Sequence, residues 1–344
     1  MPILAEQPLL YFSLYPPIGD CDWRYTFATA QVRALEDKMF SAQFFTELAN
    51  ARDINDLFQM LAGTEYAFAP QAADSDTEQM LLQQRTETRM LFERLIIDDQ
   101  IIRMFRARID FANMRLAIRR FVLKRPLGVD YCREGNISAE QFEAAFEKED
   151  YGTLPEYLRQ GIEAGILGYY KNKNVCDIDL EIDKVEADFL LNCAKSIGSV
   201  FLVELLRMQI DLTNIRTMMR MKFTGLQNTD VFLAGGYVEK SRLIQCLDIG
   251  YESLAQYFYA TPYYHLIETG AAYLQKENSF LKLEAVCDEH FLGFLKTTGY
   301  IAAGTQPIIA YLFLKEHQIR NIRMTLAAKR NGLEARFILD RLRC

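Results

Sequence analysis

The sequence is poor in the residues that make turns. Glycine and proline supply only 18 and 9 of the 344 residues. β-Sandwiches and β-barrels need many such turns, so the shortage argues against them and favours long helices. Half of the residues are apolar, and this content excludes a disordered chain.

Motifs that carry chemistry are missing as well. Only three histidines occur, His265, His290 and His317, and none lies in an HExxH pattern. Neither GxxxxGK[ST] nor GxGxxG is present, which argues against nucleotide binding by either phosphate loop. The seven cysteines form no CxxC pair, so we expect reduced thiols rather than a zinc site or a disulfide framework. The sequence therefore predicts no catalytic residue, no metal and no cofactor.

Charge and hydropathy narrow the class of partner. A net charge of −7 disfavours a surface that coats nucleic acid. The most apolar windows, residues 189–206 and 301–314, are both interrupted by polar residues, glycine or proline and are shorter than the roughly 20 apolar residues that span a bilayer. Residues 1–18 lack the basic start of a signal peptide, since the first cation is Arg24. We expect a cytoplasmic chain without direct transmembrane insertion.

Helical periodicity dominates the rest of the chain. Apolar residues recur at steps of 3, 4 and 7 between Leu91 and Ile109, and again between Ile308 and Leu326. Pro307 is expected to mark the start of the second helix and Asn331-Gly332 its end. Strand-like alternation occurs only in residues 177–183, which we interpret as a loop that enters a helix. The predicted fold class is all-α.

The chain contains an internal repeat. Residues 109–119 recur as residues 210–220, and the same offset of 101 carries residues 135–142 onto 236–243. A weaker third copy surrounds Asn321; there Gln318 replaces the aspartate, and Glu316 is expected to take its part. The repeat predicts three similar helical subdomains, residues 1–125, 126–224 and 225–344.

Each copy of the motif has two faces. Asp110 and Asn113 are neighbours on one face of a helix, while Arg115 and Arg119 lie on the other. We expect the first face to tie helices together by satisfying buried polar groups. This structural set is Asp110, Asn113, Asp211, Asn214, Glu316 and Asn321. The arginines are expected to meet an acidic or carbonyl-rich partner, and they are Arg115, Arg119, Arg216, Arg220, Arg320 and Arg323.

Two weaker patterns leave alternatives open. Asp98-Asp99 resembles the metal-binding aspartates of all-α terpenoid synthases, although the third aspartate of that pattern is missing. Residues 177–188 have acidic residues in an EF-hand register, but Ile182 stands where the loop needs glycine, so we interpret them as an acidic helix N-terminus. The alternatives are a metal-dependent enzyme of terpenoid-synthase type and a generic helical scaffold.

Several segments together resemble one known family. They are residues 25–36, 61–66, 135–138 and 315–323, with the Asp-x-x-Asn-x-Arg copies at 110–115 and 211–216. In this order they resemble the C subunit of V-type and A-type rotary ATPases, which corresponds to the d subunit of the eukaryotic vacuolar enzyme. The chain departs from the family at residues 28–30, where an arginine is usual, and at Val185, where an aspartate is usual.

The resemblance implies a fold, a role and partners. The fold is an all-α, funnel-shaped protein of three similar subdomains about a pseudo-threefold axis. The role is a non-catalytic socket that couples the central stalk to the membrane rotor ring for ATP-linked proton or sodium transport. The implied partners are central-stalk subunits D and F, the proteolipid subunits of the ring, and the stator membrane subunit as a further contact. The implied location is the cytoplasmic face of the membrane.

Overall fold

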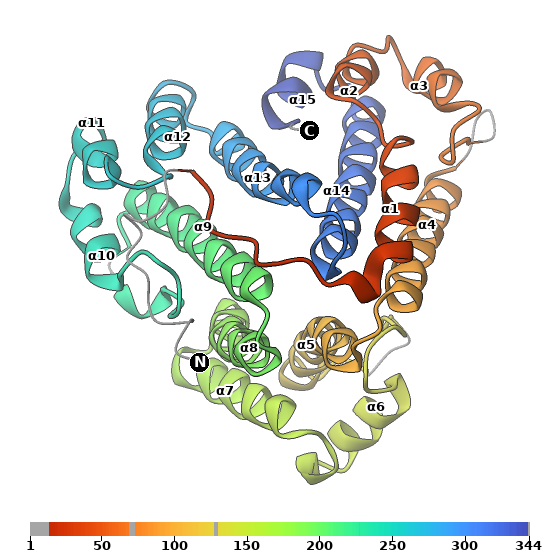
Figure 1. Cartoon of the computed structure of the whole chain (residues 1–344). Helices are drawn as coiled ribbons and strands as arrows, with labels where there is room; N and C mark the ends of the chain where they lie inside the picture. The colour runs from red at the N-terminus through yellow and green to blue at the C-terminus, as the bar shows by residue number, and fades with distance from the viewer. Residues whose placement is uncertain (1–13, 69–72, 127–129, 227, 343–344) are drawn as a thin grey trace. The chain divides into compact units, whose positions relative to one another are not determined.

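The computed structural model describes residues 14–68, 73–126, 130–226 and 228–342. In these ranges the chain forms fifteen α-helices joined by loops and 3-10 turns, and no β-strand (Figure 1). The prediction of an all-α fold is therefore confirmed. The expectations for the first 13 residues and for the thiol of Cys344 lie outside the described residues.

Contacts divide the chain into two units, and each is described by itself. The first unit comprises residues 98–248, and the second combines residues 14–97 with 249–342 among those described. The beginning and the end of the described chain thus fold together, which is visible in Figure 1 as red and orange helices beside dark blue ones.

The first unit is built on four long helices and two short ones. Its elements are α5 (Asp99–Val122), α6 (Ala139–Glu147), α7 (Glu156–Asn172), α8 (Val175–Ile197), α9 (Val200–Thr224) and α10 (Lys240–Asp248). Helices α5, α7 and α8 pack on one another, α9 packs on α8, and the short helices α6 and α10 cover α5 and α9. Phe111, Met114 and Ile118 of α5 form a core with Phe142 and Phe146 of α6.

Residues 177–183 are helical, so the interpretation of this segment as a loop is wrong. Asn174 caps the start of α8 by accepting a hydrogen bond from the backbone N–H of Cys176. Ile178 and Ile182 are one helical turn apart and are both fully buried. Asp179 and Asp183 alternate with these isoleucines and form ion pairs with Arg119 and Arg115 of α5.

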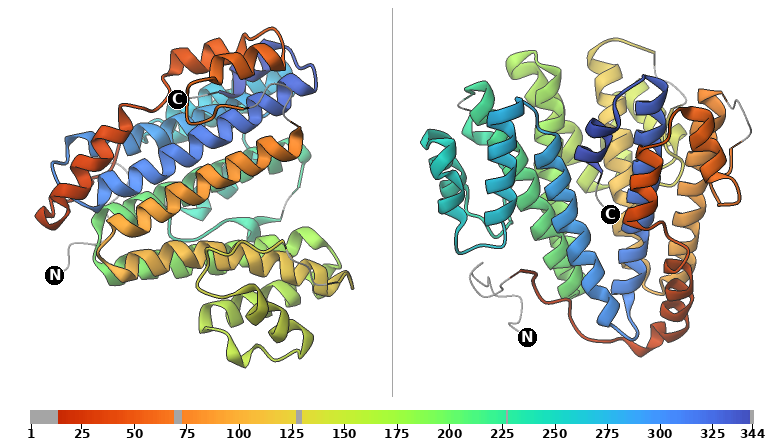
Figure 2. Two further views of the ribbon diagram at one scale, coloured as in Figure 1. Left: turned by 90° about the vertical axis from the view of Figure 1, so that its right-hand side faces the viewer. Right: turned by 90° about the horizontal axis from the view of Figure 1, so that it is seen from above.

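The second unit is organised around its longest helix. Its elements are α1 (Thr26–Glu36), α2 (Ala42–Ala49), α3 (Ile54–Leu61), α4 (Asp74–Leu95), α11 (Tyr251–Leu254), α12 (Tyr264–Glu277), α13 (Leu281–Lys296), α14 (Thr305–Arg330) and α15 (Ala335–Arg341). Helix α14 contacts α1, α4 and α13, and it runs alongside α4 (Figure 2). Pro307 lies in the first turn of α14, Asn331 caps its end and Gly332 follows with a positive φ of 67°, as predicted.

The apolar pattern around residues 91–109 spans two helices. Helix α4 ends at Leu95, and Asp98 starts α5 by accepting a hydrogen bond from the backbone N–H of Gln100. Asp98 is therefore a helix cap, which accounts for one of the two aspartates that resemble a metal motif. Six of the cysteines lie in the described ranges, and all six are free thiols.

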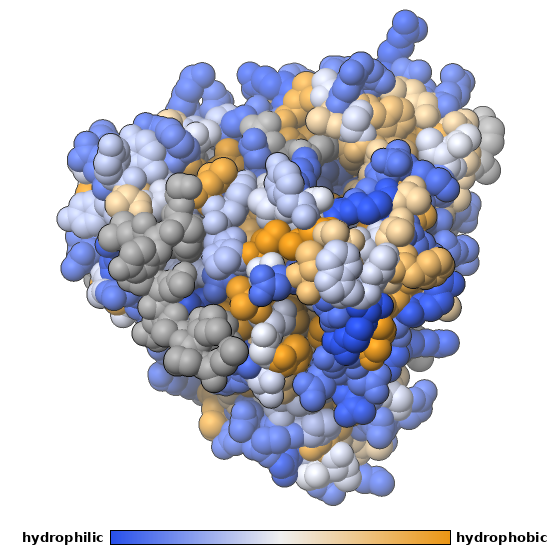
Figure 3. Space-filling model, viewed as in Figure 1, coloured by the Kyte–Doolittle hydropathy of each residue, from blue (hydrophilic) through white to orange (hydrophobic). Residues whose placement is uncertain are grey.

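Apolar residues are mostly inside each unit. Hydrophilic residues cover most of the face in Figure 3, and apolar residues are exposed between them in small areas. Within the described residues, no helix combines the length and the apolar character that crossing a membrane requires.

One core histidine leads to a testable pH dependence. His290 of α13 is 8% exposed between the rings of Tyr15 and Tyr263, and burial lowers its pKa to about 4. In the unfolded chain the pKa returns to about 6.5, so the unfolded state binds the extra proton as the pH falls from 6.5 to 4. We expect this histidine to cost about 2 kcal/mol of stability at pH 5 relative to pH 8.

The variant His290→Phe tests this expectation. Urea unfolding at pH 8 and pH 5 should show a smaller acid loss for the variant than for the wild type. His265→Phe is the matched control, because the side chain of His265 is 89% exposed. An acid loss of equal size in wild type and His290→Phe would contradict the assignment.

Candidate functional site

The asparagine of the first motif copy binds a loop. Asn113 lies in the middle of α5 and is 3% exposed. Its side-chain Nδ2 donates to the carbonyl of Cys132 at 2.8 Å, and its Oδ1 accepts from the N–H of the same residue at 2.9 Å. The amide thus satisfies both backbone groups of Cys132, as a neighbouring β-strand would. This pairing explains an asparagine in a helix interior, where its intrinsic propensity is poor.

The aspartate of the same copy holds the next part of that loop. Asp110 is fully buried and accepts hydrogen bonds from the backbone N–H of Ile137 at 3.1 Å, from Asn136 Nδ2 at 2.9 Å and from Tyr157 Oη at 2.7 Å. Burial raises the pKa of Asp110, and the hydrogen bonds partly oppose that rise. Burial, together with the nearby carboxylate, also raises the pKa of Tyr157. We use the name polar clamp for the two side chains of a motif copy, here Asp110 and Asn113, together with the loop that they bind.

The second motif copy builds the same clamp on α9. Asn214 Nδ2 donates to the carbonyl of Leu233 at 3.0 Å, and Asn214 Oδ1 accepts from the N–H of Leu233 at 2.8 Å. Asp211 accepts from the N–H groups of Tyr237 and Val238 at 3.1 and 3.0 Å. In both copies the paired loop residue lies 19 positions after the asparagine. The repeat seen in the sequence is therefore a repeat of hydrogen bonds.

The repeated glycine has a steric reason. A Cβ atom added at Gly135 would overlap the carboxylate of Asp110, and one added at Gly236 would overlap the carboxylate of Asp211. The loop passes so close to the aspartate that a side chain at this position would displace it. The position of the aspartate carboxylate therefore requires a glycine in the loop, and this requirement explains why both residues recur together at an offset of 101 residues.

A related contact occurs on α14 in the second unit. Gln318, at the aspartate's position, accepts from the backbone N–H of Phe40 at 2.8 Å, and Ser41 then caps α2. In the first unit Ile137 is held in the same way, and Ser138 caps α6. On α14 the clamped residue, Phe40, precedes Gln318 by 278 residues, whereas on α5 and α9 the clamped loop follows the helix.

The cores beneath these contacts use matching positions. Phe111, Met114 and Ile118 of α5 pack in the core with α6, and Ile319, Ile322 and Leu326 of α14 pack in the core with α2. The two sets differ by 208 residues at each position, which is also the interval from Asn113 to Asn321. Helix α2 therefore packs in a core with α14 in the same way that α6 packs in a core with α5.

The residues around Gln318 in the third copy contact other partners. Asn321 Nδ2 lies 3.0 Å from His317 Nε2, one helical turn earlier on α14. Glu316, expected to take the part of the aspartate, forms an ion pair with Arg89 of α4 at 2.8 Å. Lys315 is 4% exposed and pairs with Glu65, which joins two of the segments on which the family resemblance depends. The repeat places Gln318 at the aspartate's position, although the expectation fell on Glu316, and no pattern in the sequence pointed to Lys315 as a residue that holds the N-terminal region.

The arginines of the first copy pair within the first unit. Arg115 forms ion pairs with Asp183 and, at 2.7 Å, with Glu186 of α8. Burial acts to lower the pKa of Arg115, but the two carboxylates outweigh it and the pKa is raised. Arg119 pairs with Asp179. These contacts explain the acidic residues at the start of α8.

The arginines of the third copy pair within the second unit. Arg320 contacts Asp288 of α13 at 3.2 Å, and Arg323 contacts Glu78 of α4 at 3.0 Å. Surface ion pairs of this kind contribute about 0–1 kcal/mol and exchange readily for other partners.

The six arginines differ in exposure. The side chains of Arg119 and Arg320 are 46% and 55% exposed, and Arg220 is also exposed. Arg115, Arg216 and Arg323 are half-buried. Arg119, Arg220 and Arg320 are therefore the exposed members of the set.

The described residues contain no group of three His, Cys, Asp or Glu side chains placed to hold a metal ion. The three histidines differ in their surroundings: His265 is exposed, while His290 and His317 are buried in the second unit. The repeated motif binds the backbone of its own chain.

Comparison with known proteins identifies the family. The family described as ATP synthase (C/AC39) subunit matches residues 28–341. The chain is 23% identical to the C subunit of the V-type sodium ATPase of Enterococcus hirae, over 91% of this chain and 96% of that protein. It is 25% identical to the C subunit of the A-type ATP synthase of Thermococcus kodakarensis, over 92% of this chain and 91% of that protein.

The chain belongs to the C/AC39 subunit family of V-type and A-type ATPases. Members of this family are non-catalytic subunits of a rotary ATPase, and the resemblance found in the sequence is confirmed over the length of the chain.

Proposed function

We propose that this chain is the central-rotor socket of a V/A-type rotary ATPase. In this role it receives the central-stalk subunits D and F and rests on the proteolipid ring at the cytoplasmic face of the membrane. It couples ATP-driven rotation to proton or sodium transport, with the stator membrane subunit as a further contact. The observation that carries the proposal is the match of nearly the whole chain to the C subunits of such ATPases.

The polar clamps support a mechanical role. A part that transmits torque must keep its helices in register while force passes through it. Asp110 and Asp211 each fix a loop through bonds that are shielded from water, where hydrogen bonds are stronger and restrict motion. A body stiffened in this way suits a socket.

We extend the proposal to a threefold organisation. The predicted subdomains end near residues 125 and 224, and each contains one motif helix, α5, α9 or α14. The related contacts of Asp110, Asp211 and Gln318 support a threefold repeat, although each contact joins a motif helix to a loop of a different predicted subdomain. In the third subdomain the helix that packs against the motif helix α14 is α2. The core of residues 225–344 therefore includes residues from the N-terminal part of the chain.

The exposed arginines supply a test of the socket. We expect Arg119→Glu, Arg220→Glu and Arg320→Glu together to weaken stalk binding and to lower the number of ions moved per ATP hydrolysed. Charge reversal at a contact turns attraction into repulsion. The measurement is ion uptake and ATP hydrolysis by complexes in vesicles, with circular dichroism to show that the subunit is folded.

A matched set of reversals controls for charge alone. Arg52, Arg159 and Arg242 are exposed and lie outside the motif, and they are distributed between the two units like the test set. Unchanged coupling in the first triple variant would refute the placement of these arginines. Failure of the tagged chain to recover stalk and ring subunits from its own cells would refute the socket itself and favour a generic scaffold.

A further inference from the structure

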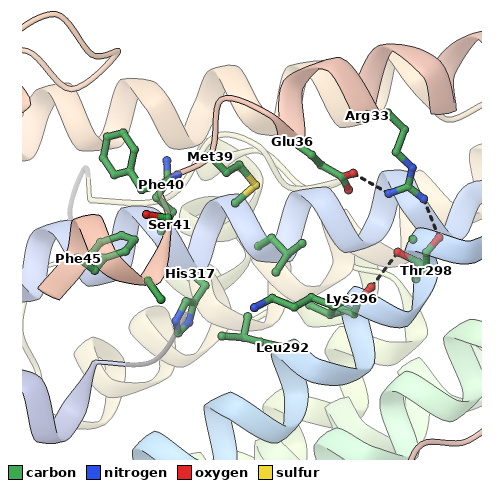
Figure 4. Close-up of a pocket in the computed structure, with 15 residues that line it drawn as sticks. Arg33, Glu36, Met39, Phe40, Ser41, Phe45, Leu292, Lys296, Thr298 and His317 are labelled. Atoms are coloured by element: carbon green, nitrogen blue, oxygen red, sulfur yellow. Dashed lines mark hydrogen bonds and ion pairs between the residues drawn. The ribbon is translucent and has the colours of Figure 1, made fainter.

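The second unit contains a pocket of about 340 Å³ between α1, α2, α13 and α14 (Figure 4). This volume lies within the range of small-molecule sites. Most of its wall surface is apolar, and the large apolar residues that line it are Met39, Phe40, Phe45, Leu292, Leu295 and Leu314. An occupant would therefore bury an apolar body.

The pocket has one cation without a counter-charge. Figure 4 shows the side chain of Lys296 lying along the pocket beside Leu292, with its amine toward His317. Among the described residues no carboxylate forms an ion pair with Lys296, whereas Arg33 and Glu36, the other charged lining residues, pair with each other at 2.6 Å. The lining thus carries one net positive charge at the end where His317 lies.

The corresponding loop of the first unit passes close to its helices. There the loop residue Gly235 lies so close to α8 and α9 that a Cβ would be 2.6 Å from Leu191 and 3.6 Å from Ile210. In the second unit the corresponding helices are α13 and α14, and the corresponding loop, residues 37–41, leaves the space that Met39 and Phe40 line.

We propose that this pocket binds a single-chain amphiphilic anion, with a carboxylate or phosphate head at Lys296 and an apolar chain against Leu292, Leu295 and Phe45. The apolar walls select the chain, and the unpaired ammonium selects the charge. Because its walls come from both the N-terminal and the C-terminal helices of the second unit, an occupant would hold these segments together. The proposal does not depend on the socket function, since it concerns the isolated chain.

Calorimetric titration of the full chain with octanoate and with octyl phosphate tests the proposal. We expect one site for at least one of these two anions, with octylammonium and 1-octanol binding at least about tenfold more weakly because they lack the head that Lys296 pairs with. Vesicles of phosphatidylglycerol should not bind, since a two-chain lipid held in a bilayer cannot place its chains in the pocket. Binding to vesicles but not to the soluble anions would overturn the proposal in favour of a membrane surface.

Three variants locate the site. Lys296→Glu should weaken octanoate binding at least about tenfold, while Lys282→Glu makes the same charge change on α13, 14 residues earlier, and should leave it unchanged. Ala42→Trp should abolish binding by filling the mouth, and it should leave the unfolding temperature of the free chain unchanged because Ala42 is exposed. Equal binding of octanoate to wild type, Lys296→Glu and Ala42→Trp, or no binding of either anion to the wild type, would overturn the proposal.

Discussion

Asn214→Ala is expected to lower the free energy of unfolding by about 3–4 kcal/mol. The change leaves both the N–H and the carbonyl of Leu233 without their partner in a buried place, and each unsatisfied group costs about 1–3 kcal/mol. The better helix propensity of alanine returns only about 0.7 kcal/mol. Urea unfolding followed by circular dichroism measures the loss.

Hydrogen exchange identifies its cause. The amide of Leu233 should lose protection in Asn214→Ala, because its acceptor is removed. Asn192→Ala is the matched control: Asn192 is exposed on the adjacent helix α8 and bonds only to the side chain of Asp188. We expect no loss of stability for the control. Wild-type protection of Leu233 in Asn214→Ala would contradict the clamp.

Gly236→Ala is expected to cost about 3 kcal/mol, although it adds only one methyl group. The new Cβ would overlap the carboxylate of Asp211, so the carboxylate must leave the N–H groups of Tyr237 and Val238. Gly299→Ala is the control, since nothing lies within 4 Å of a Cβ there and no positive φ strains it. It should change stability by less than about 0.5 kcal/mol.

A double-mutant cycle makes the mechanism specific. Gly236→Ala and Asp211→Ala both destroy the same bonds, so the double variant should lose little more stability than the worse single one. The coupling free energy is then about 2–3 kcal/mol. Additive losses of stability would mean that Gly236→Ala acts through the backbone conformation alone and not by displacing Asp211.

Much of the fold was predictable because it is a local property. Helices α5 and α14 follow from apolar spacing, and the limits of α14 follow from Pro307, Asn331 and Gly332. These signals depend on residues within a few turns of one another. The family was recognised for a similar reason: its short motifs keep their order along the chain.

The local sequence pattern was misleading at the start of α8, where apolar and acidic residues alternate within a helix. The alternation in residues 177–183 is typical of a strand or loop, yet it belongs to α8. The acidic positions there are set by Arg115 and Arg119 on another helix. A pattern imposed by a partner helix has no fixed period along its own chain, so it cannot be interpreted reliably from that chain segment alone.

The repeat was visible in the sequence, but its meaning was only partly so. The offset of 101 residues predicted that Asp110 and Asp211 do the same thing. It did not predict that each faces a glycine-containing loop at contact distance, because that distance depends on how α6 and α10 cover their helices. In the third copy the sequence pointed to Glu316, whereas the loop contact is made by Gln318.

The helical class, the repeated motif and the family could all be predicted, since each is recorded in residues close together along the chain. Three features depend instead on packing. They are the identity of the loop that each motif binds, the contact of residues 37–49 with α14, which lies far away in the sequence, and the pocket beside Lys296. The physical reason is that a buried hydrogen bond can be completed by any backbone group that packing brings within about 3 Å, and packing joins segments without regard to their separation in sequence.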